Sequence, residues 1–189
     1  MLKEEARKIF KEKRGRLSPT EKIKYDDLLL IQFQKLPLPF LSVVLSFYPI
    51  EENKEVNTFI LTDYLSFKYP HLQIAYPKSD TASASMQAIV CDDDTLFEKN
   101  RWNIHEPAAC EMIAPQDIDL VLIPMLGFDK EGNRVGYGKG YYDHFLKECS
   151  EDCLKVGVCY FEPVEQIEDA SEFDVPLDFC ITPQKVYVF

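Results

Sequence analysis

The segment from Asp119 to Leu146, DLVLIPMLGFDKEGNRVGYGKGYYDHFL, is the part of the chain that most constrains its fold. It starts with an apolar run typical of a buried strand, passes through a turn at 129–133, and places Gly136, Gly138 and Gly140 at alternate positions before a predicted helix. Glycine lets the backbone adopt unusual dihedrals and approach a ligand closely. A glycine loop between a strand and a helix points several N–H groups at one spot, where an anion binds well.

Arg134 and Lys139 add positive charge to this loop, so we interpret it as a phosphate site and expect a nucleotide there. It is not a Walker A loop, because no Gly-Lys pair is followed by Ser or Thr. The dinucleotide fingerprint fails too, since the spacing is G-x-G-x-G and no ribose-binding acid is evident. On the glycines alone, an ordinary tight strand–helix connection is the alternative.

The longer motif around the glycine loop favours the phosphate-site interpretation over an ordinary connection. It contains Pro124, Gly127-Phe128-Asp129, Gly132, Arg134 and the run 136–143. This pattern closely resembles the signature of the 5-formyltetrahydrofolate cyclo-ligase family, also called methenyltetrahydrofolate synthetase, whose usual form is near P-G-x-A-F-D-x-x-G-x-R-L-G-x-G-x-G-Y-Y-D. Met125, Gly127 and Val135 stand where that form has glycine, alanine and leucine, and none of these changes a charged or loop-glycine position.

Weaker matches to the same family lie on both sides of this motif, in the order expected for the family. They are Lys3-x-x-x-Arg7, Tyr48 with Glu55 to Thr58, Trp102-x-Ile104-x-Glu106-Pro107, and Phe173-Asp174 with Asp178 and Thr182. Phe173 occupies a position where the family more usually has histidine. Their order and spacing with the central string make the resemblance strong.

Apolar and polar patterning predicts strands alternating with helices. Strands are expected at 41–47, 73–76, 85–91, 120–123, 156–160, 179–182 and 186–189, and helices at 2–14, 19–35, 58–68 and after the glycine loop. Ser18-Pro19-Thr20-Glu21 is a capping box that begins the second helix. We therefore expect one α/β domain over residues 1–189, with a largely parallel central sheet between helices in three layers and ligands at the carboxyl ends of strands. The resemblance implies a Rossmann-like fold shared with phosphosugar isomerases and CoA transferases.

The resemblance also implies a reaction, the ATP- and Mg²⁺-dependent conversion of 5-formyltetrahydrofolate to 5,10-methenyltetrahydrofolate. The formyl carbonyl is amide-like and unreactive until ATP phosphorylates its oxygen, after which N10 can close the ring and expel phosphate. Such chemistry asks the protein for positioning and charge neutralisation rather than for a nucleophilic side chain.

Carried over residue by residue, the resemblance implies the following sites. ATP binding is expected of Lys3, Glu4, Glu5, Ala6, Arg7, Arg134, Val135, Gly136, Tyr137, Gly138, Lys139, Gly140, Tyr141 and Tyr142, with Arg134 and Lys139 as catalytic residues. Folate binding is expected of Ile50, Glu55, Trp102, Tyr137, Gly138, Lys139, Gly140 and Tyr141. Asp143 and Asp174 are the expected Mg²⁺ ligands, since Mg²⁺ uses few carboxylates plus phosphate oxygens.

Some of these residues have simpler explanations. Glu55 could be a solvated charge, Trp102 a core residue, Glu106 a structural acid, and Asp143 a helix N-cap. Two other functional classes also stay open. One is a phosphosugar-isomerase-like or CoA-transferase-like enzyme, because fold does not fix function, and the other is a non-catalytic nucleotide-binding module.

Charge and composition narrow the partners. The 189-residue chain has a net charge of −11, and its first 24 residues are net basic, with nine Lys/Arg against four Asp/Glu, so the remainder is strongly acidic and argues against nucleic-acid binding. Apolar runs are too short for a membrane span, and the charged N-terminus does not resemble a targeting signal. Small-molecule partners, a monomer and a cytoplasmic location are expected. The six cysteines contain no C-x-x-C pair, so buried thiols are expected rather than a zinc site.

Overall fold

The computed structural model describes residues 1–80, 85–108 and 111–189. Its helices are α1 Lys3–Gly15, α2 Pro19–Phe33, α3 Phe59–Lys68 and α4 Tyr141–Leu146, with 3-10 turns η1 Glu51–Asn53 and η2 Pro115–Asp117. The strands of the main sheet are β1 Val43–Leu45, β2 Gln73–Asp80, β3 Ser85–Cys91, β6 Met112–Ile113, β7 Leu120–Pro124, β10 Leu154–Val158, β11 Phe179–Ile181 and β12 Val186–Val188. Two small hairpins pair β4 Phe97–Lys99 with β5 His105–Pro107 and β8 Gly127–Phe128 with β9 Arg134–Val135.

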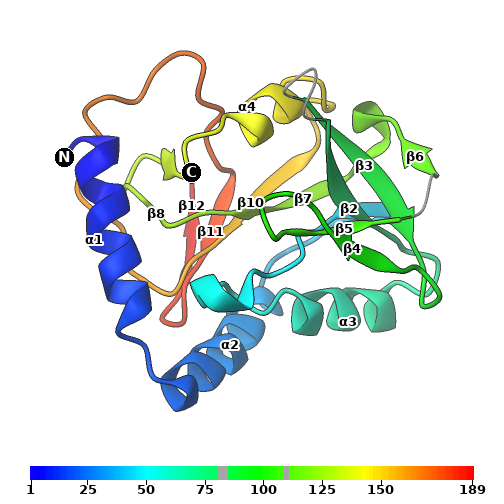
Figure 1. Cartoon of the computed structure of the whole chain (residues 1–189), viewed down its shortest axis with the longest axis horizontal. Helices are drawn as coiled ribbons and strands as arrows, with labels where there is room; N and C mark the ends of the chain where they lie inside the picture. Colours follow the sequence, from blue (N-terminus) through cyan, green and yellow to red (C-terminus); the bar gives the residue numbers. More distant parts are fainter. Residues whose placement is uncertain (81–84, 109–110) are drawn as a thin grey trace.

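The main sheet has the strand order β12-β11-β10-β7-β1-β2-β3-β6 (Figure 1). Strands β11, β10, β7, β1 and β2 run parallel to one another. Strand β12 is antiparallel to β11 at one edge, and β3 is antiparallel to both β2 and β6 at the other. The predicted single α/β domain with a mostly parallel sheet flanked by helices is therefore confirmed.

Side chains of the central strand β7 point alternately to the two faces of the sheet, and both faces are covered by other parts of the chain. Leu120 and Leu122 face the cluster that contains Leu29 of α2 and Leu61 of α3, while Val121 packs in the cluster on the opposite face. All of these side chains are fully buried. A parallel strand covered on both faces needs such a continuous apolar run. Figure 1 shows α2 and α3 together on one side of the sheet and α4 on the other.

The predicted capping box begins α2, where the Ser18 hydroxyl accepts from the Glu21 amide at 3.2 Å and the Glu21 carboxylate accepts from the Ser18 amide at 2.9 Å. The strand expected at 41–47 is shorter, and the strand expected at 73–76 extends to Asp80 because it pairs along its length with β3. Both small hairpins escaped prediction, since their strands of two or three residues are too short to show a period.

The expectation of buried thiols is right for only some cysteines. Cys153, Cys159 and Cys180 are buried, whereas Cys91 and Cys149 are partly exposed, and all five are free thiols. Cys110 lies outside the described residues. Among the described helices, none is long and apolar enough to cross a membrane.

The sheet has one switch point. From β1 the chain adds β2 on one side, and it later adds β7, β10 and β11 on the other. Ligands of open α/β sheets bind beyond the carboxyl ends of strands where the order reverses in this way. The carboxyl ends of β1 and β7 therefore mark where a site should lie.

Candidate active site

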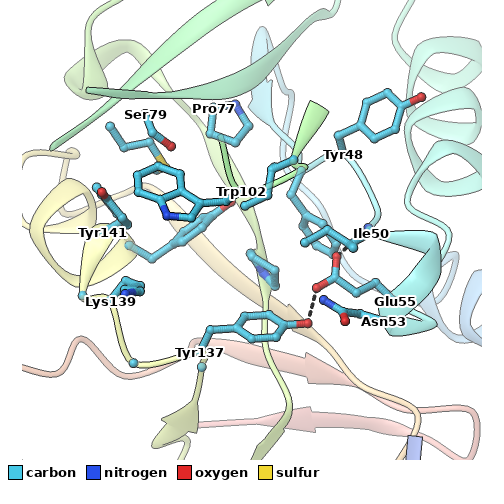
Figure 2. A pocket seen from close by; sticks show the side chains of 18 of the residues that line it. Tyr48, Ile50, Asn53, Glu55, Pro77, Ser79, Trp102, Tyr137, Lys139 and Tyr141 are labelled. Carbon is cyan, nitrogen blue, oxygen red and sulfur yellow. Dashed lines mark hydrogen bonds between the residues drawn. The ribbon is translucent and has the colours of Figure 1, made fainter. Parts of the chain in front are cut away.

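A pocket of about 670 Å³ lies at that switch point. Its walls include Tyr48 and Ile50 after β1, Pro124 at the end of β7, and the glycine loop 136–140 before α4. Figure 2 shows Tyr137, Lys139 and Tyr141 reaching into it from the glycine loop and the start of α4, opposite side chains that follow β1. Helix α1 contributes to the same pocket although it is distant in sequence.

Most of the predicted site residues line this pocket. They are Lys3, Arg7, Ile50, Glu55, Trp102, Arg134, Gly136, Tyr137, Gly138, Lys139, Gly140, Tyr141, Tyr142, Asp143 and Asp174. Four others do not. Glu4 and Glu5 are exposed on α1, while Ala6 and Val135 are fully buried in the core beneath it. A helix presents only residues three or four apart on one face and a strand only alternate residues, so the neighbours of Lys3 and Arg7 on α1 and of Arg134 on β9 turn away from the pocket.

The glycine loop is reached through the β8–β9 hairpin rather than directly from β7. Asp129 shapes the turn of that hairpin, because its buried carboxylate accepts from the amides of Glu131 at 3.0 Å, Asn133 at 2.9 Å and Ile167 at 2.9 Å. Asp129 therefore has a structural role, because it holds the β8–β9 hairpin that leads into the glycine loop.

Two of the three glycines need their lack of a side chain. Gly138 has φ 89° and Gly140 has φ 74°, in the left-handed region that other residues resist. A Cβ at Gly136 would meet nothing within 4 Å, so its position carries no such requirement. Helix α1 lies against this loop, where the Arg7 Nε donates to the Gly136 carbonyl at 3.0 Å and Arg7 Nη2 lies 3.3 Å from an ideal Cβ on Gly138.

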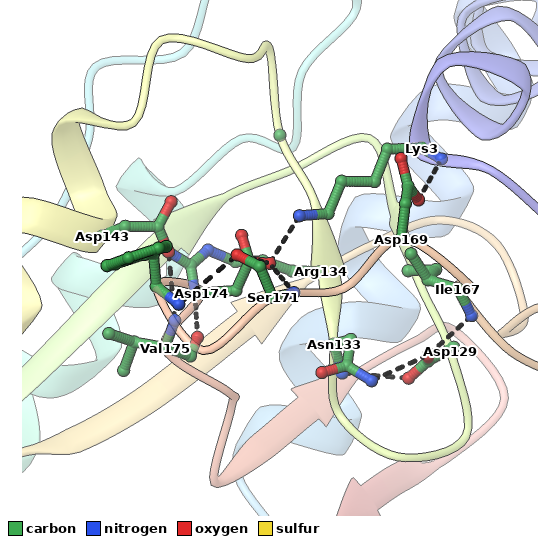
Figure 3. A network of polar contacts seen from close by, with 12 residues as sticks. Lys3, Asp129, Asn133, Arg134, Asp143, Ile167, Asp169, Ser171, Asp174 and Val175 are labelled. Carbon is green, nitrogen blue, oxygen red and sulfur yellow. Dashed lines mark hydrogen bonds and ion pairs between the residues drawn. The ribbon is translucent and has the colours of Figure 1, made fainter.

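Two ion pairs lie at the pocket (Figure 3). The Lys3 Nζ donates to Asp174 Oδ2 at 2.5 Å, and Arg134 donates to Asp143 Oδ1. Burial raises the pKa of Asp174, but the hydrogen bonds from Lys3 and Ser171 outweigh it and leave that pKa below its usual value. Burial lowers the pKa of Arg134 despite the neighbouring carboxylate.

Asp143 does not cap its own helix. The cap position of α4 is Gly140 and no side chain bonds there, whereas Asp143 Oδ1 accepts from the Val175 amide at 3.1 Å as well as from Arg134. The helix-cap alternative is therefore wrong. Arg134 also donates to the Val175 carbonyl, so this acid and base fasten α4 to the segment before β11.

The acids at the pocket fit a metal that arrives with a nucleotide rather than a preformed metal cage. No group of three or more His, Cys, Asp or Glu in the described residues could hold a metal. Asp143 and Asp174 each accept hydrogen bonds through one oxygen, and the second oxygen accepts none from the described residues. Mg²⁺ is often held by one or two carboxylates plus phosphate oxygens and water, and Asp143 and Asp174 can supply the carboxylates.

Glu55 is 5% exposed, so the solvated-charge alternative is wrong. The Tyr137 hydroxyl donates to its Oε1 and the Ile50 amide to its Oε2 at 2.8 Å (Figure 2). Burial raises the pKa of Glu55, partly offset by these hydrogen bonds and by Arg14. Glu55 is therefore a buried acid at the pocket wall, and its ionised form depends on the hydrogen bonds from Tyr137 and Ile50 and on the charge of Arg14.

Trp102 is 39% exposed and lines the pocket from the loop between β4 and β5, so it is not a core residue. Glu106 ties that hairpin to β2, because its Oε1 accepts from the Ser79 amide at 2.9 Å and from Asn100 Nδ2 at 2.8 Å. Asn100 Oδ1 in turn accepts from the Trp102 amide at 2.9 Å. Glu106 thus has a structural role that supports the tryptophan.

Two side chains at the site, His105 and Arg14, had no predicted role, and a third, Tyr142, shows a feature that the sequence could not reveal. His105 lines the pocket with its ring stacked on Tyr48 at 4.4 Å between centroids. The hydroxyl of Tyr142, already expected near ATP, is buried with no hydrogen-bond partner among the described residues, which fits a polar ligand group that would bond to it. Arg14 carried no motif signal, because its pairing with residues far along the chain appears only in three dimensions.

Comparisons with known proteins agree on one group. A sequence model of the 5-formyltetrahydrofolate cyclo-ligase family matches residues 2–183. The chain is 30% identical over 188 residues to a 5-formyltetrahydrofolate cyclo-ligase of Mycoplasma pneumoniae, covering 97% of this chain and 100% of the relative. Among solved structures, it resembles the 5,10-methenyltetrahydrofolate synthetase of Aquifex aeolicus with a TM-score of 0.82 and 29% identity, covering 100% of this chain and 93% of the other. The synthetase of Mycoplasma pneumoniae gives a TM-score of 0.75 and 27% identity over 96% of this chain and 98% of the other.

Proposed function

The chain belongs to the 5-formyltetrahydrofolate cyclo-ligase family and is a ligase of that kind, and we propose that it converts 5-formyltetrahydrofolate to 5,10-methenyltetrahydrofolate using ATP and Mg²⁺, with release of ADP and phosphate. One observation carries the proposal beyond family membership. A single pocket combines a glycine loop and cations suited to a polyphosphate with a buried acid and aromatic side chains suited to a pterin.

In the proposed reaction, the formyl oxygen attacks the γ-phosphorus and ADP leaves. N10 then attacks the activated carbon and loses its proton, and the carbon–oxygen bond breaks to release phosphate. Arg134 and Lys139 are proposed to stabilise charge on the transferred phosphoryl group, and Lys3 and Arg7 to cover the nucleotide from α1. Lys139 suits this role because it is exposed in the pocket and forms no ion pair with any described residue.

The same proposal assigns the folate end of the pocket. Glu55 would accept hydrogen bonds from the N–H groups of the pterin, with Ile50, Tyr137 and Tyr141 lining its ring and Trp102 closing the wall. Mg²⁺ would be held by Asp143 and Asp174 together with the phosphates, where it supplies further charge neutralisation. The protein is proposed to act as a cytoplasmic monomer on these small molecules.

The decisive test follows methenyl product formation by its near-ultraviolet absorbance in purified protein. We expect turnover only when 5-formyltetrahydrofolate, ATP and Mg²⁺ are all present, because the carbonyl is unreactive until it is phosphorylated. Undiminished product without ATP would refute the mechanism. Nucleotide binding without turnover in the complete mixture would instead favour the non-catalytic binding module.

A further inference from the structure

Arg14, in the last turn of α1, has its guanidinium buried behind the pocket wall. Its Nη1 donates to the Tyr137 hydroxyl at 3.0 Å and lies 3.9 Å from Glu55 Oε1, and its Nη2 donates to the Met125 carbonyl at 2.5 Å. Arg14 is 6% exposed and does not line the pocket, so it acts on a ligand only through these neighbours.

A buried cation is costly unless an opposite charge and hydrogen bonds compensate it. Within the part of the chain that the structure describes, Glu55 is the only carboxylate in an ion pair with Arg14. The pairing is reciprocal, because Glu55 forms its only ion pair in that part with Arg14 as well. Each charge is thus the ion-pair partner of the other, and for Glu55 this attraction adds to the hydrogen bonds from Tyr137 and the Ile50 amide.

Arg14, Tyr137 and Glu55 form a chain of hydrogen bonds in which the donors can be assigned. An arginine can only donate, so the Tyr137 oxygen accepts from Arg14 and its proton points to Glu55. The Glu55 oxygen must therefore accept, which an ionised carboxylate does best. Arg14 therefore fixes the direction of the hydrogen bond that reaches Glu55, and its positive charge favours the ionised form of that acid.

We propose that Arg14 is a positioning residue for the folate subsite, which keeps the Glu55 carboxylate ionised and aimed at the pterin while it fixes Tyr137 in the wall. This inference rests on the role given to Glu55 in the proposed function. It also makes α1 a helix that serves both substrates. Lys3 and Arg7 stand at the nucleotide, and Arg14 follows seven residues later on the same face.

The other groups that face Glu55 cannot replace this cation. Tyr137 and Tyr142 have pKa values raised chiefly by burial, so both stay neutral near neutral pH. Burial likewise raises the pKa of Tyr160, whose hydroxyl donates to the Glu55 carbonyl at 3.1 Å and to Asp26 at 2.6 Å. Asp26 is an acid, and it is already paired with Lys22 on its own helix.

The test measures binding of 5-formyltetrahydrofolate without ATP as a function of pH, followed by the fluorescence of Trp102, the only tryptophan of the chain. The variants are Arg14→Gln, which is neutral, and Arg14→Lys, which keeps a cation. Glu55→Gln identifies the part of the profile due to Glu55. Arg14→Met, which keeps the apolar stem, is a second neutral variant in case Arg14→Gln does not fold. Circular dichroism and ATP affinity report whether each variant is folded.

We expect the wild type to lose folate affinity as pH falls through the Glu55 pKa, and Glu55→Gln to lack this acid limb. Removing the Arg14 charge should move the limb to higher pH and weaken binding on the order of tenfold below it, since moving the midpoint by about one pH unit changes affinity tenfold there. Arg14→Lys should restore the wild-type midpoint.

The failures are distinguishable. A wild type without a Glu55-dependent limb would contradict the role of Glu55 in the proposed function. A clear wild-type limb whose midpoint stays in place in both neutral variants would overturn the role of Arg14. An equal loss of affinity at every pH would also overturn it, because that result indicates only a structural contribution.

Discussion

Alanine substitutions at Gly138 and Gly136 separate the two reasons for a glycine in this loop. Gly138 has φ 89°, and a Cβ there would lie 3.3 Å from Arg7 Nη2. Gly136 has no left-handed φ, and a Cβ there would meet nothing within 4 Å. The two positions are two residues apart and line the same pocket, so each variant is the control for the other.

The two alanine substitutions are expected to change the stability of the protein in opposite directions. An alanine in the left-handed region costs roughly 1–2 kcal/mol. The contact with Arg7 adds little, because the end of a flexible side chain can shift by a few tenths of an ångström. Alanine at Gly136 should instead be neutral or stabilise by about 0.4–1 kcal/mol, since it reduces the entropy of the unfolded chain without strain.

The energetic cost of alanine at Gly138 can appear either in the free energy of unfolding or in the affinity for ATP. If the loop keeps its conformation, the free energy of unfolding falls; if the loop relaxes to a negative φ, ATP affinity falls by about 5–30-fold, as 1.4 kcal/mol corresponds to tenfold. Urea unfolding and calorimetry with a non-hydrolysable ATP analogue should therefore give losses that together reach roughly 1–2 kcal/mol. Gly138→Ala that matches Gly136→Ala in both measurements would refute the reasoning.

Three further substitutions test other parts of the site. Glu55→Gln should weaken folate binding by about 1.5–3 kcal/mol with ATP affinity unchanged, and calorimetry showing equal folate affinity would contradict this. Because the folded-state pKa of Glu55 is raised, its contribution to stability is lost as pH rises through that pKa, so Glu55→Gln should gain stability relative to wild type with rising pH in urea unfolding. Asp143→Asn should lower the rate and shift the Mg²⁺ midpoint upward, with partial recovery at high Mg²⁺; an unshifted midpoint would exclude a metal role. Asn100→Ala should change the emission of Trp102 and weaken folate binding but not ATP binding, and an unchanged spectrum would show that Asn100 does not hold the loop.

The fold was predictable where one residue pattern determines one structure. The apolar run of β7 identified a buried strand, and Ser18 with Glu21 identified the start of α2. The β4–β5 hairpin was not predictable, because its short strands are held by Glu106 and Asn100 rather than by their own propensities. Tertiary contacts decide such elements, and local sequence does not contain them.

The residues brought to the pocket were predictable to the extent that a motif names them. Lys3 and Gly138, for example, lie more than a hundred residues apart in sequence and line one pocket. The motif could not tell that Val135 faces the core, or that Gly136 has no conformational need of glycine. It also gave no role to Arg14, whose partners come from three separate segments. Burial, dihedral angles and ion pairing are properties of the folded chain.

Two cations of the pocket, Lys3 and Arg134, are already paired with carboxylates, which bears on how the site works. Lys3 is bonded to Asp174 and Arg134 to Asp143, so the cations proposed for the phosphates are held by the carboxylates proposed for the metal. A nucleotide that arrived without a divalent cation would have to compete with both carboxylates for the same cations and would meet their negative charge. Lys139 and Arg7 form no ion pair with any described residue, so these two cations are free to attract it first. The pairing therefore orients Lys3 and Arg134 in advance and favours a nucleotide whose charge is already partly neutralised.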